Sequence, residues 1–399
     1  MIKVTTIEGE STASMVRAWD GFFCIGIFGN QYFEEYKANH FNAYASFGLN
    51  LNTLKKLEDL NMRYLPYWPG SPICNWPGKK ERRVVEDYTT SPFSITPPYK
   101  QSIKILKQIK DSPSIFAYYL IDEPDCRDWE RKELPVSKRI GFYSAECEKM
   151  AKVCRMIDPK NLTMILVDNT FRPANWYIYA EIADIFCTDP YDYITLAKPY
   201  YLERVTHLAY NACSPRPLII VPYIAGSFYP RGRYATPDEH RINVYYAIGR
   251  GAKGLIYYIH SGCGRENGCK YNPILWREVG RVNKEVRKVA PFLSIGHPVD
   301  LVSCSSEKVW ATAILAGDKG IVIPVVNRNY QATRKKFVIS PLENVSIQVD
   351  IPEWMKIKKV LWVKYDRDEP LKYIRQGRKI KIELGRLYSA KLLLLKGGI

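Results

Sequence analysis

The chain has 399 residues, of which 46% are hydrophobic and 25% charged, and its formal net charge is +17. This length predicts one large domain with a smaller one, and the composition is typical of a soluble globular protein. No apolar run approaches the length of a membrane span, which argues against a membrane-spanning protein. The cysteines lack a Cys-x-x-Cys pair and the five histidines are dispersed, so we expect no metal and no cofactor.

The first residues do not show the pattern of a signal peptide. Residues 1–19 contain no basic segment followed by an apolar one. We therefore expect a cytoplasmic protein with a short N-terminal extension, and an extracellular or surface-associated location is the alternative. The composition is rich in Lys, Ile and Tyr, which weakly indicates a thermophilic origin.

Strand-like and helix-like segments alternate through residues 20–296. The expected strands cover residues 22–28, 43–47, 64–67, 115–121, 163–167, 185–188, 218–223 and 254–259. Most are short apolar runs without alternation, as in parallel strands that are buried on both faces. Eight such βα units predict a (β/α)8 barrel, whereas the open doubly wound sheet lacks its Gly-x-Gly-x-x-Gly fingerprint.

Amphipathic segments separate the strands. Apolar residues recur at helical spacing in 52–61 and 138–157. The sequence Thr236-Pro237-Asp238-Glu239 predicts a capping box at the start of the seventh helix. The proline-rich residues 71–100 interrupt the alternation and predict a long loop, either a lid or binding element or a plain surface excursion.

The sequence pattern changes in residues 297–399. Segments 309–314, 320–327, 345–351, 360–365, 380–384 and 390–395 have the pattern of strands separated by turns, which predicts a small antiparallel β-sandwich domain. Many lysines and arginines crowd into residues 356–381. They could attract an anionic surface or glycan, or simply be solvated strand faces. No nucleic-acid-binding motif accompanies them.

The chemistry of a barrel lies at the carboxyl ends of its strands. Asp122-Glu123-Pro124 follows the apolar fourth strand and is the strongest signal there. Two adjacent carboxylates after a buried strand are costly to desolvate, which favours a catalytic role. We expect a raised pKa on one of them and an ordinary pKa on the other, so that they divide into acid and stabiliser. Pairing with Arg127 at a loop is the structural alternative.

This arrangement resembles the superfamily of (β/α)8 glycoside hydrolases over residues 20–294. The supporting segments are Ala183-Asp184-Ile185 leading to Asp189-Pro190-Tyr191, and Gly251-Ala252-Lys253-Gly254 before the eighth strand. The resemblance implies that Glu123 is the proton donor of a glycosidase that acts on an oligosaccharide or glycoconjugate.

The sequence departs from this superfamily at the seventh strand, where retaining enzymes usually carry a nucleophilic glutamate. Residues 221–228 contain no carboxylate. Two explanations stay open. Asp122 and Glu123 could act together as in substrate-assisted β-N-acetylhexosaminidases and β-N-acetylgalactosaminidases, where the 2-acetamido group of the substrate attacks. Alternatively, Asp189 or Asp192 could supply the base or nucleophile.

Several other residues at strand ends could bind a sugar by ring stacking or hydrogen bonding. These candidates are Asn30, Trp68, Asn169, Tyr191, Tyr223, Tyr258 and His260. Core packing is at least as good an explanation for the aromatic residues. The main alternative function is a non-catalytic carbohydrate-binding or surface protein on a degenerate glycosidase barrel.

Overall fold

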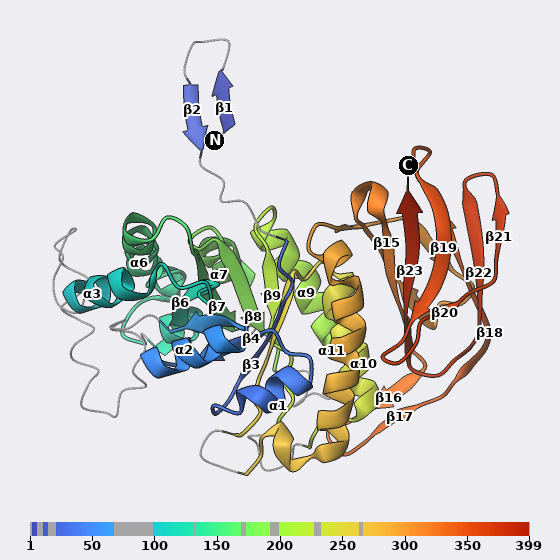
Figure 1. Ribbon diagram of the computed structural model, residues 1–399, viewed down its shortest axis with the longest axis horizontal. Helices are drawn as coiled ribbons and strands as arrows, with labels where there is room; N and C mark the ends of the chain where they lie inside the picture. Colours follow the sequence, from blue (N-terminus) through green and yellow to red (C-terminus); the bar gives the residue numbers. More distant parts are fainter. Residues whose placement is uncertain are drawn as a thin grey trace.

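The computed structural model describes residues 2–5, 11–14, 21–67, 99–130, 132–168, 173–191, 199–226, 233–262 and 266–398. It consists of a (β/α)8 barrel followed by an antiparallel β domain, as predicted (Figure 1). A small hairpin of β1 (Ile2–Thr5) and β2 (Ser11–Ser14) precedes the barrel. The predicted loop at 71–100 lies almost entirely outside the described residues.

Eight parallel strands form the barrel sheet. They are β3 (Cys24–Phe28), β4 (Ala43–Ser46), β5 (Arg63–Pro66), β6 (Ala117–Asp122), β7 (Leu162–Asp168), β8 (Ile185–Asp189), β9 (Leu218–Ile220) and β10 (Gly254–Tyr257). The hydrogen-bonded order is β5-β4-β3-β10-β9-β8-β7-β6, and parallel bridges from Tyr64 to Ile115 and from Tyr67 to Tyr119 connect β5 to the β6 segment. The sheet therefore closes on itself, and its carboxyl ends gather on one face.

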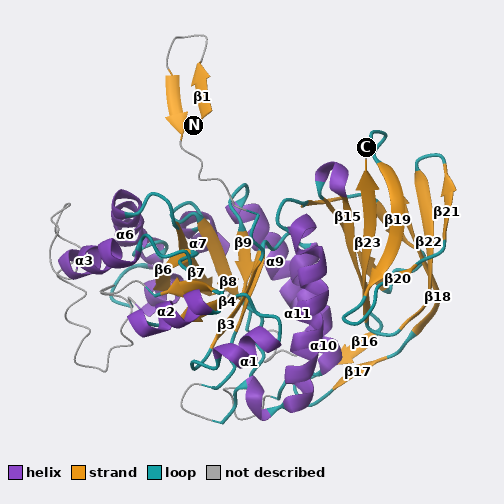
Figure 2. Cartoon of the chain, viewed as in Figure 1, coloured by secondary structure: helices purple, strands orange, loops and turns teal. Residues whose placement is uncertain are grey.

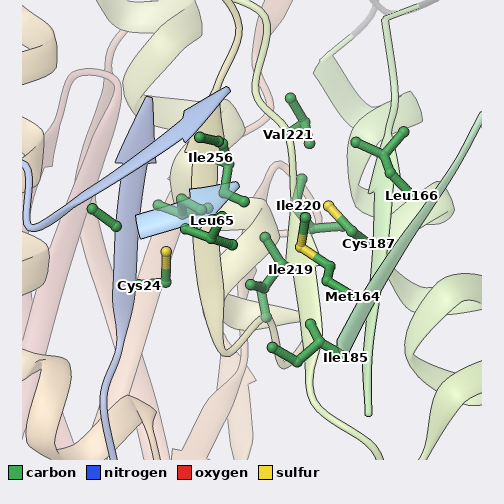
Figure 3. Packing of buried hydrophobic residues seen from close by; sticks show 14 of the residues in the cluster. Cys24, Leu65, Met164, Leu166, Ile185, Cys187, Ile219, Ile220, Val221 and Ile256 are labelled. Carbon is green, nitrogen blue, oxygen red and sulfur yellow. The ribbon is translucent and has the colours of Figure 1, made fainter. Parts of the chain in front are cut away.

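The strands lack alternation because helices cover the outside of the barrel and side chains fill the inside. Every residue of β3, β8, β9 and β10 is buried. Figure 3 shows Met164, Ile185, Cys187 and Ile219 packed among neighbouring strands. The apolar runs in the sequence are thus the consequence of burial on both faces.

The helices lie between successive strands (Figure 2). They are α1 (Phe33–Ala38), α2 (Leu51–Asp59), α3 (Tyr99–Ile109), α4 (Pro124–Glu130), α5 (Val136–Arg139), α6 (Ser144–Ile157), α7 (Pro173–Tyr179), α9 (Pro199–Cys213), α10 (Pro237–Gly249) and α11 (Pro273–Leu293). Short 3-10 turns occur at η3 (Cys269–Tyr271) and η4 (Gly317–Lys319). The predicted capping box is present: Thr236 accepts from the Glu239 amide, and Glu239 accepts from the Thr236 amide.

The single helix predicted at 138–157 is wrong, because the chain breaks between α5 and α6. Gly141 has a φ of 67°, and a side chain there would meet Ile178 at 2.9 Å. The buried Asp128 carboxylate accepts the amides of Gly141 and Tyr143 at 2.9 and 3.2 Å. These amides therefore bond to a side chain instead of continuing one helix.

The β domain contains two packed sheets. One has the order β11-β14-β15-β23-β19-β20, with β13 also paired to β15, and the other has the order β12-β18-β22-β21. The strands are β11 (His297–Val299), β12 (Val302–Cys304), β13 (Val309–Ala311), β14 (Ala313–Leu315), β15 (Gly320–Asn327), β18 (Leu342–Asp350), β19 (Lys356–Val363), β20 (Glu369–Pro370), β21 (Tyr373–Gln376), β22 (Lys379–Leu387) and β23 (Ala390–Gly398). Side chains of both sheets, including Val325 and Ile382, share one core, as in the predicted sandwich.

A separate hairpin of β16 (Tyr330–Ala332) and β17 (Phe337–Ile339) leaves these sheets and lies beside α10 (Figure 1). The lysines and arginines of residues 356–381 are exposed where they fall in β21, β22 and the turn between them. Among the helices of the described ranges, none is long and apolar enough to cross a membrane. Cys147 and Cys154 of α6 are buried free thiols.

Arg241 joins the barrel helices to the β domain. Its guanidinium donates to Glu278 at 2.6 and 2.9 Å and also to Glu285, linking α10 to α11. Glu285 in turn accepts the Tyr245 hydroxyl at 2.5 Å and the Tyr365 amide, which belongs to the β domain, at 3.1 Å. One arginine therefore pairs with two buried carboxylates at the junction.

Replacing Arg241 with Met should lower the free energy of unfolding by about 3–5 kcal/mol, because Glu285 would remain buried without its cation. Chemical denaturation measures the change. Arg281→Met is the control: Arg281 is 42% exposed and lies 3.7 Å from Glu278, so its loss should cost less than about 1 kcal/mol. Equal effects of the two substitutions would contradict this role for Arg241.

Candidate active site

Three neighbouring strands of the barrel end in carboxylates. β6 ends at Asp122 and is followed by Glu123, β7 ends at Asp168, and β8 ends at Asp189. Asp168 and Asp189 are direct partners in the register of β7 and β8, and the Glu123 amide donates to Leu166 of β7 at 2.9 Å. The closed sheet therefore gathers four acidic residues at one edge of its carboxyl-end face.

Glu123 occupies a conformation that non-glycine residues rarely adopt. Its φ is 45°, and Pro124 immediately begins α4. Left-handed backbone at a non-glycine residue costs free energy and is found where the surrounding structure imposes it, often at functional sites. This turn ends the regular strand and separates the surroundings of Glu123 from those of Asp122.

Asp122 is held by tyrosines from two strands. Its carboxylate accepts the hydroxyl of Tyr119, and its amide donates to the Tyr67 hydroxyl at 3.0 Å. Burial raises the pKa of Asp122, while the hydrogen bond from Tyr119 and the charge of Arg127 oppose the rise. The expectation of an ordinary pKa for one of the two adjacent carboxyls is therefore wrong, because both are desolvated.

Glu123 and Asp189 come from the two strands that flank β7, and a hydrogen bond between their carboxyl groups lowers the pKa of Glu123 and raises that of Asp189. Burial, and next the charge of Asp122, raises the pKa of Glu123 from 4.5 to about 7. Burial, and next the charge of Glu123, raises the pKa of Asp189 well above its ordinary value. Two buried carboxyls in contact titrate as a pair and retain a shared proton where isolated acids are ionised.

Arg127, on α4, acts on this group only from a distance. Its charge lowers the pKa of both Asp122 and Glu123, but the opposing effect of burial is larger. In the part of the chain that the structure describes, no ion pair joins Arg127 to either carboxylate. The alternative explanation, in which Asp122 and Glu123 only form an ion pair with Arg127, is therefore not supported by a contact between them.

Asp168 is a member of the acidic group that sequence reasoning did not select. Its charge raises the pKa of Asp122, Glu123 and Asp189. Its carboxylate accepts the Cys126 thiol at 2.9 Å, and its amide donates to Asp125 at 3.0 Å. Its place at the end of the fifth strand was visible in the sequence, but its pairing with Asp189 depends on strand register.

Aromatic rings surround the acidic group. Tyr191, two residues after the end of β8, stacks on Tyr258 with ring centroids 5.4 Å apart and lies edge-on to Tyr223 at 5.1 Å. Burial, and next the charge of Asp189, raises the pKa of Tyr191, so its hydroxyl stays protonated beside the acids. Tyr223 is itself buried and donates to the Gly226 carbonyl at 2.7 Å, whereas Tyr258 is half-buried.

Phe47 adds an exposed ring that the sequence analysis did not propose for sugar binding. It directly follows β4, is 51% exposed, and stacks on Phe28 at 5.0 Å. Its ring also lies 6.4 Å from those of Tyr119 and Tyr258. The mouth therefore offers an accessible apolar surface next to the tyrosine that bonds to Asp122, of the kind that stacks on the apolar face of a sugar.

His260 and Asn30 lie together at another part of the rim. The His260 ring is buried, with Tyr36 and Ser261 at 3.3 and 3.1 Å from Nδ1 and Glu35 at 3.2 Å from Nε2. Burial lowers the pKa of His260, which favours the neutral imidazole. Asn30 is exposed, and its amide donates to the Ser261 hydroxyl at 3.3 Å. Their contacts connect β3, α1 and β10 and involve none of the four acids.

Three other predicted site residues, Trp68, Asn169 and Asp192, lie outside the described residues. Residues 221–226, which follow β9, are described and contain no carboxylate. The glutamate that retaining enzymes usually carry at the seventh strand is therefore missing from this segment. Across the described ranges, no group of three or more His, Cys, Asp or Glu residues is arranged to hold a metal ion.

Comparison with known proteins gives a similarity in structure alone. No protein-family model and no curated sequence matches the chain. A cycloisomaltooligosaccharide glucanotransferase from Paenibacillus sp. superposes with a TM-score of 0.59 at 8% identity, over 94% of this chain and 85% of that one. An α-amylase from Geobacillus thermoleovorans gives 0.54 at 12% identity, over 91% and 90%.

A β-galactosidase from Halorubrum lacusprofundi gives a TM-score of 0.52 at 11% identity, over 70% of this chain and 60% of that one. The chain has the fold of (β/α)8-barrel glycoside hydrolases. At these identities the similarity concerns the barrel and its trailing β domain. Substrate and mechanism have to be argued from the acidic group itself.

Proposed function

We propose that the protein is a glycoside hydrolase that cleaves an oligosaccharide or glycoconjugate, with Glu123 as its general acid. The gathering of Asp122, Glu123, Asp168 and Asp189 at the carboxyl ends of three adjacent strands carries the proposal, and burial together with the charge of Asp122 raises the pKa of Glu123. A leaving glycosidic oxygen must receive a proton, and a carboxyl with a pKa of about 7 still holds one near neutral pH.

Asp189 acts as a positioning residue in this proposal. The two carboxyls of a retaining glycosidase stand about 5–5.5 Å apart, and those of an inverting enzyme about 6.5–9.5 Å, because the reacting sugar or water lies between them. Asp189 instead bonds directly to Glu123. This hydrogen bond lowers the pKa of Glu123 and raises that of Asp189, so Asp189 orients the Glu123 carboxyl, while burial and the charge of Asp122 keep the pKa of Glu123 raised.

Asp122 then becomes the partner in a substrate-assisted reaction. The 2-acetamido oxygen of an N-acetylhexosamine would attack the anomeric carbon, Glu123 would protonate the leaving oxygen, and Asp122 would bind the acetamido nitrogen. Water would then open the cyclic intermediate, with Glu123 now accepting its proton. The absence of a carboxylate in residues 221–226 supports this choice, because the substrate supplies the nucleophile.

The first test is hydrolysis of aryl glycosides, both 2-acetamido and plain hexosides, by wild type and Glu123→Gln. Substitution should lower kcat by about 100- to 10,000-fold without unfolding the protein. Because Glu123 must be protonated to act, kcat/KM should fall as the pH rises through about 7. A Glu123→Gln enzyme with an unchanged rate would refute the assignment.

A second function is favoured by one observation, the missing carboxylate after β9, which also fits a barrel that binds glycans without cleaving them. In that case Glu123 would only hydrogen-bond the sugar. Tight glycan binding without turnover of any glycoside in the panel would support this carbohydrate-binding function against the hydrolase.

The two candidate partners of Glu123 are separated by Asp122→Asn and Asp189→Asn. With a 2-acetamido substrate, Asp122→Asn should lower kcat by about 100-fold or more, and an N-acetylhexosamine thiazoline should inhibit the wild type. Asp189→Asn should mainly shift the pH profile, because the amide cannot share the proton. A severe Asp189→Asn defect together with an inert thiazoline would instead identify Asp189 as base or nucleophile.

A further inference from the structure

A cavity of about 540 Å³ lies between the start of α9 and the hairpin of β16 and β17. Its walls are formed by Tyr200, Glu203 and Arg204 of α9 and by Arg328, Tyr330 and Ala332 of the β domain. A volume of this size suits a ligand of one or a few sugar units, since small-molecule sites typically occupy 300–1,000 Å³.

The cavity belongs to the rim of the face that carries the acidic group. α9 starts at Pro199, a short connection after β8 ends at Asp189. The turn of the hairpin reaches the next connection, where Arg233 donates to the Thr333 carbonyl at 3.2 Å and forms a two-pronged ion pair with Glu239 of α10. Connections that follow barrel strands surround the active face, so a long substrate bound there could extend toward this cavity.

Positive charge exceeds negative charge around the cavity. Glu203 is buried and already accepts hydrogen bonds from Arg250 and, at 3.2 Å, from Arg328. Arg204 is exposed, and no ion pair to it is present in the described segments. The cavity lining thus has two arginines and one carboxylate, and that carboxylate is already paired with Arg328 and with Arg250, which leaves the site able to accept an anion.

Arg328 is held in place before any ligand binds. Its Nε donates to the Tyr246 hydroxyl at 3.1 Å, and its guanidinium lies 5.5 and 5.7 Å from the ring centroids of Tyr246 and Trp310. Its Nη2 donates to Glu203, so Nη1 is left without a partner among the residues with described placement. A planar guanidinium fixed in this way loses little entropy when it binds a carboxylate.

We propose that this cavity binds a carboxylate-bearing sugar unit, so that the substrate is an acidic oligosaccharide. Arg204 and the Nη1 group of Arg328 would bind the carboxylate, and Tyr200, which is 39% exposed, would lie against the sugar ring. The inference rests on the proposed function only for the statement that the bound oligosaccharide is also cleaved. The net charge of +17 is consistent with an acidic substrate.

Calorimetric titration tests this site without any turnover. The probes are tetrasaccharides of hyaluronan, chondroitin and polygalacturonate, each compared with its carboxyl-reduced form, and the protein carries Glu123→Gln so that no probe is consumed. At least one acidic probe should bind at least about tenfold more tightly than its reduced form. Arg204→Glu should abolish this preference, because a charge-assisted hydrogen bond is lost and repulsion replaces it.

Arg375→Glu is the matched control, because Arg375 is also exposed but belongs to β21, away from the cavity lining. This control should keep the preference for the acidic probe. If both variants lose the preference equally, the effect depends on net charge alone and the proposed site is wrong. Equal binding of the acidic and reduced forms, or no binding of any probe, would also contradict the site. Arg204-dependent binding by a wild-type protein that hydrolyses no glycoside would refute the hydrolase and leave this site intact.

Discussion

Four carboxyl groups, of which Asp189 is buried and the other three are partly buried, share one edge of the barrel, and the cost of placing their charges there dominates the chemistry of the site. Asp122, Glu123, Asp168 and Asp189 come from three adjacent strands whose register is set by the closed sheet. Water cannot screen them fully, and Arg127 offsets only part of their charge. The group lowers its free energy by retaining protons, which is why the pKa values of Asp122, Glu123 and Asp189 all rise.

The rest of the structure maintains this edge. The closed barrel prevents β6 and β8 from moving apart, and the strained backbone of Glu123 turns its side chain to a different environment from that of Asp122. A tyrosine of β6 and tyrosines that follow β5 and β8 supply hydroxyls and rings around the acids. At the outer rim, Arg233 connects the hairpin of the β domain to α10. The trailing domain therefore takes part in shaping the face where the substrate would bind.

Much of the fold could be predicted because its determinants are local. Apolar runs such as the one that precedes Asp122 marked the barrel strands, and Thr236 with Glu239 marked the start of α10 through spacing alone. The break before α6 was missed, since it depends on the Gly141 conformation and on Asp128, a residue well outside the helix. Local periodicity contains no information about such a distant acceptor.

The site could be predicted only in part. Two carboxylates after an apolar strand identified Asp122 and Glu123, but the contact between Glu123 and Asp189 requires two strands that are distant in sequence. Asp168 and Phe47 were not predicted for the same reason. The closed sheet pairs Asp168 with Asp189 and brings the ring of Phe47 against that of Phe28. The ordinary pKa expected for one carboxyl was wrong because burial is a tertiary property.

The central claim is that Glu123 keeps its proton near neutral pH because it is buried against other acids. Infrared difference spectroscopy of wild type against Glu123→Gln measures this directly, through the carbonyl band of the protonated carboxyl followed from pH 4 to 9. The account predicts a band that disappears with a midpoint at about 7. A midpoint near 4.5, the ordinary value for glutamate, would show that Glu123 is ionised in the working enzyme and would contradict its role as the general acid.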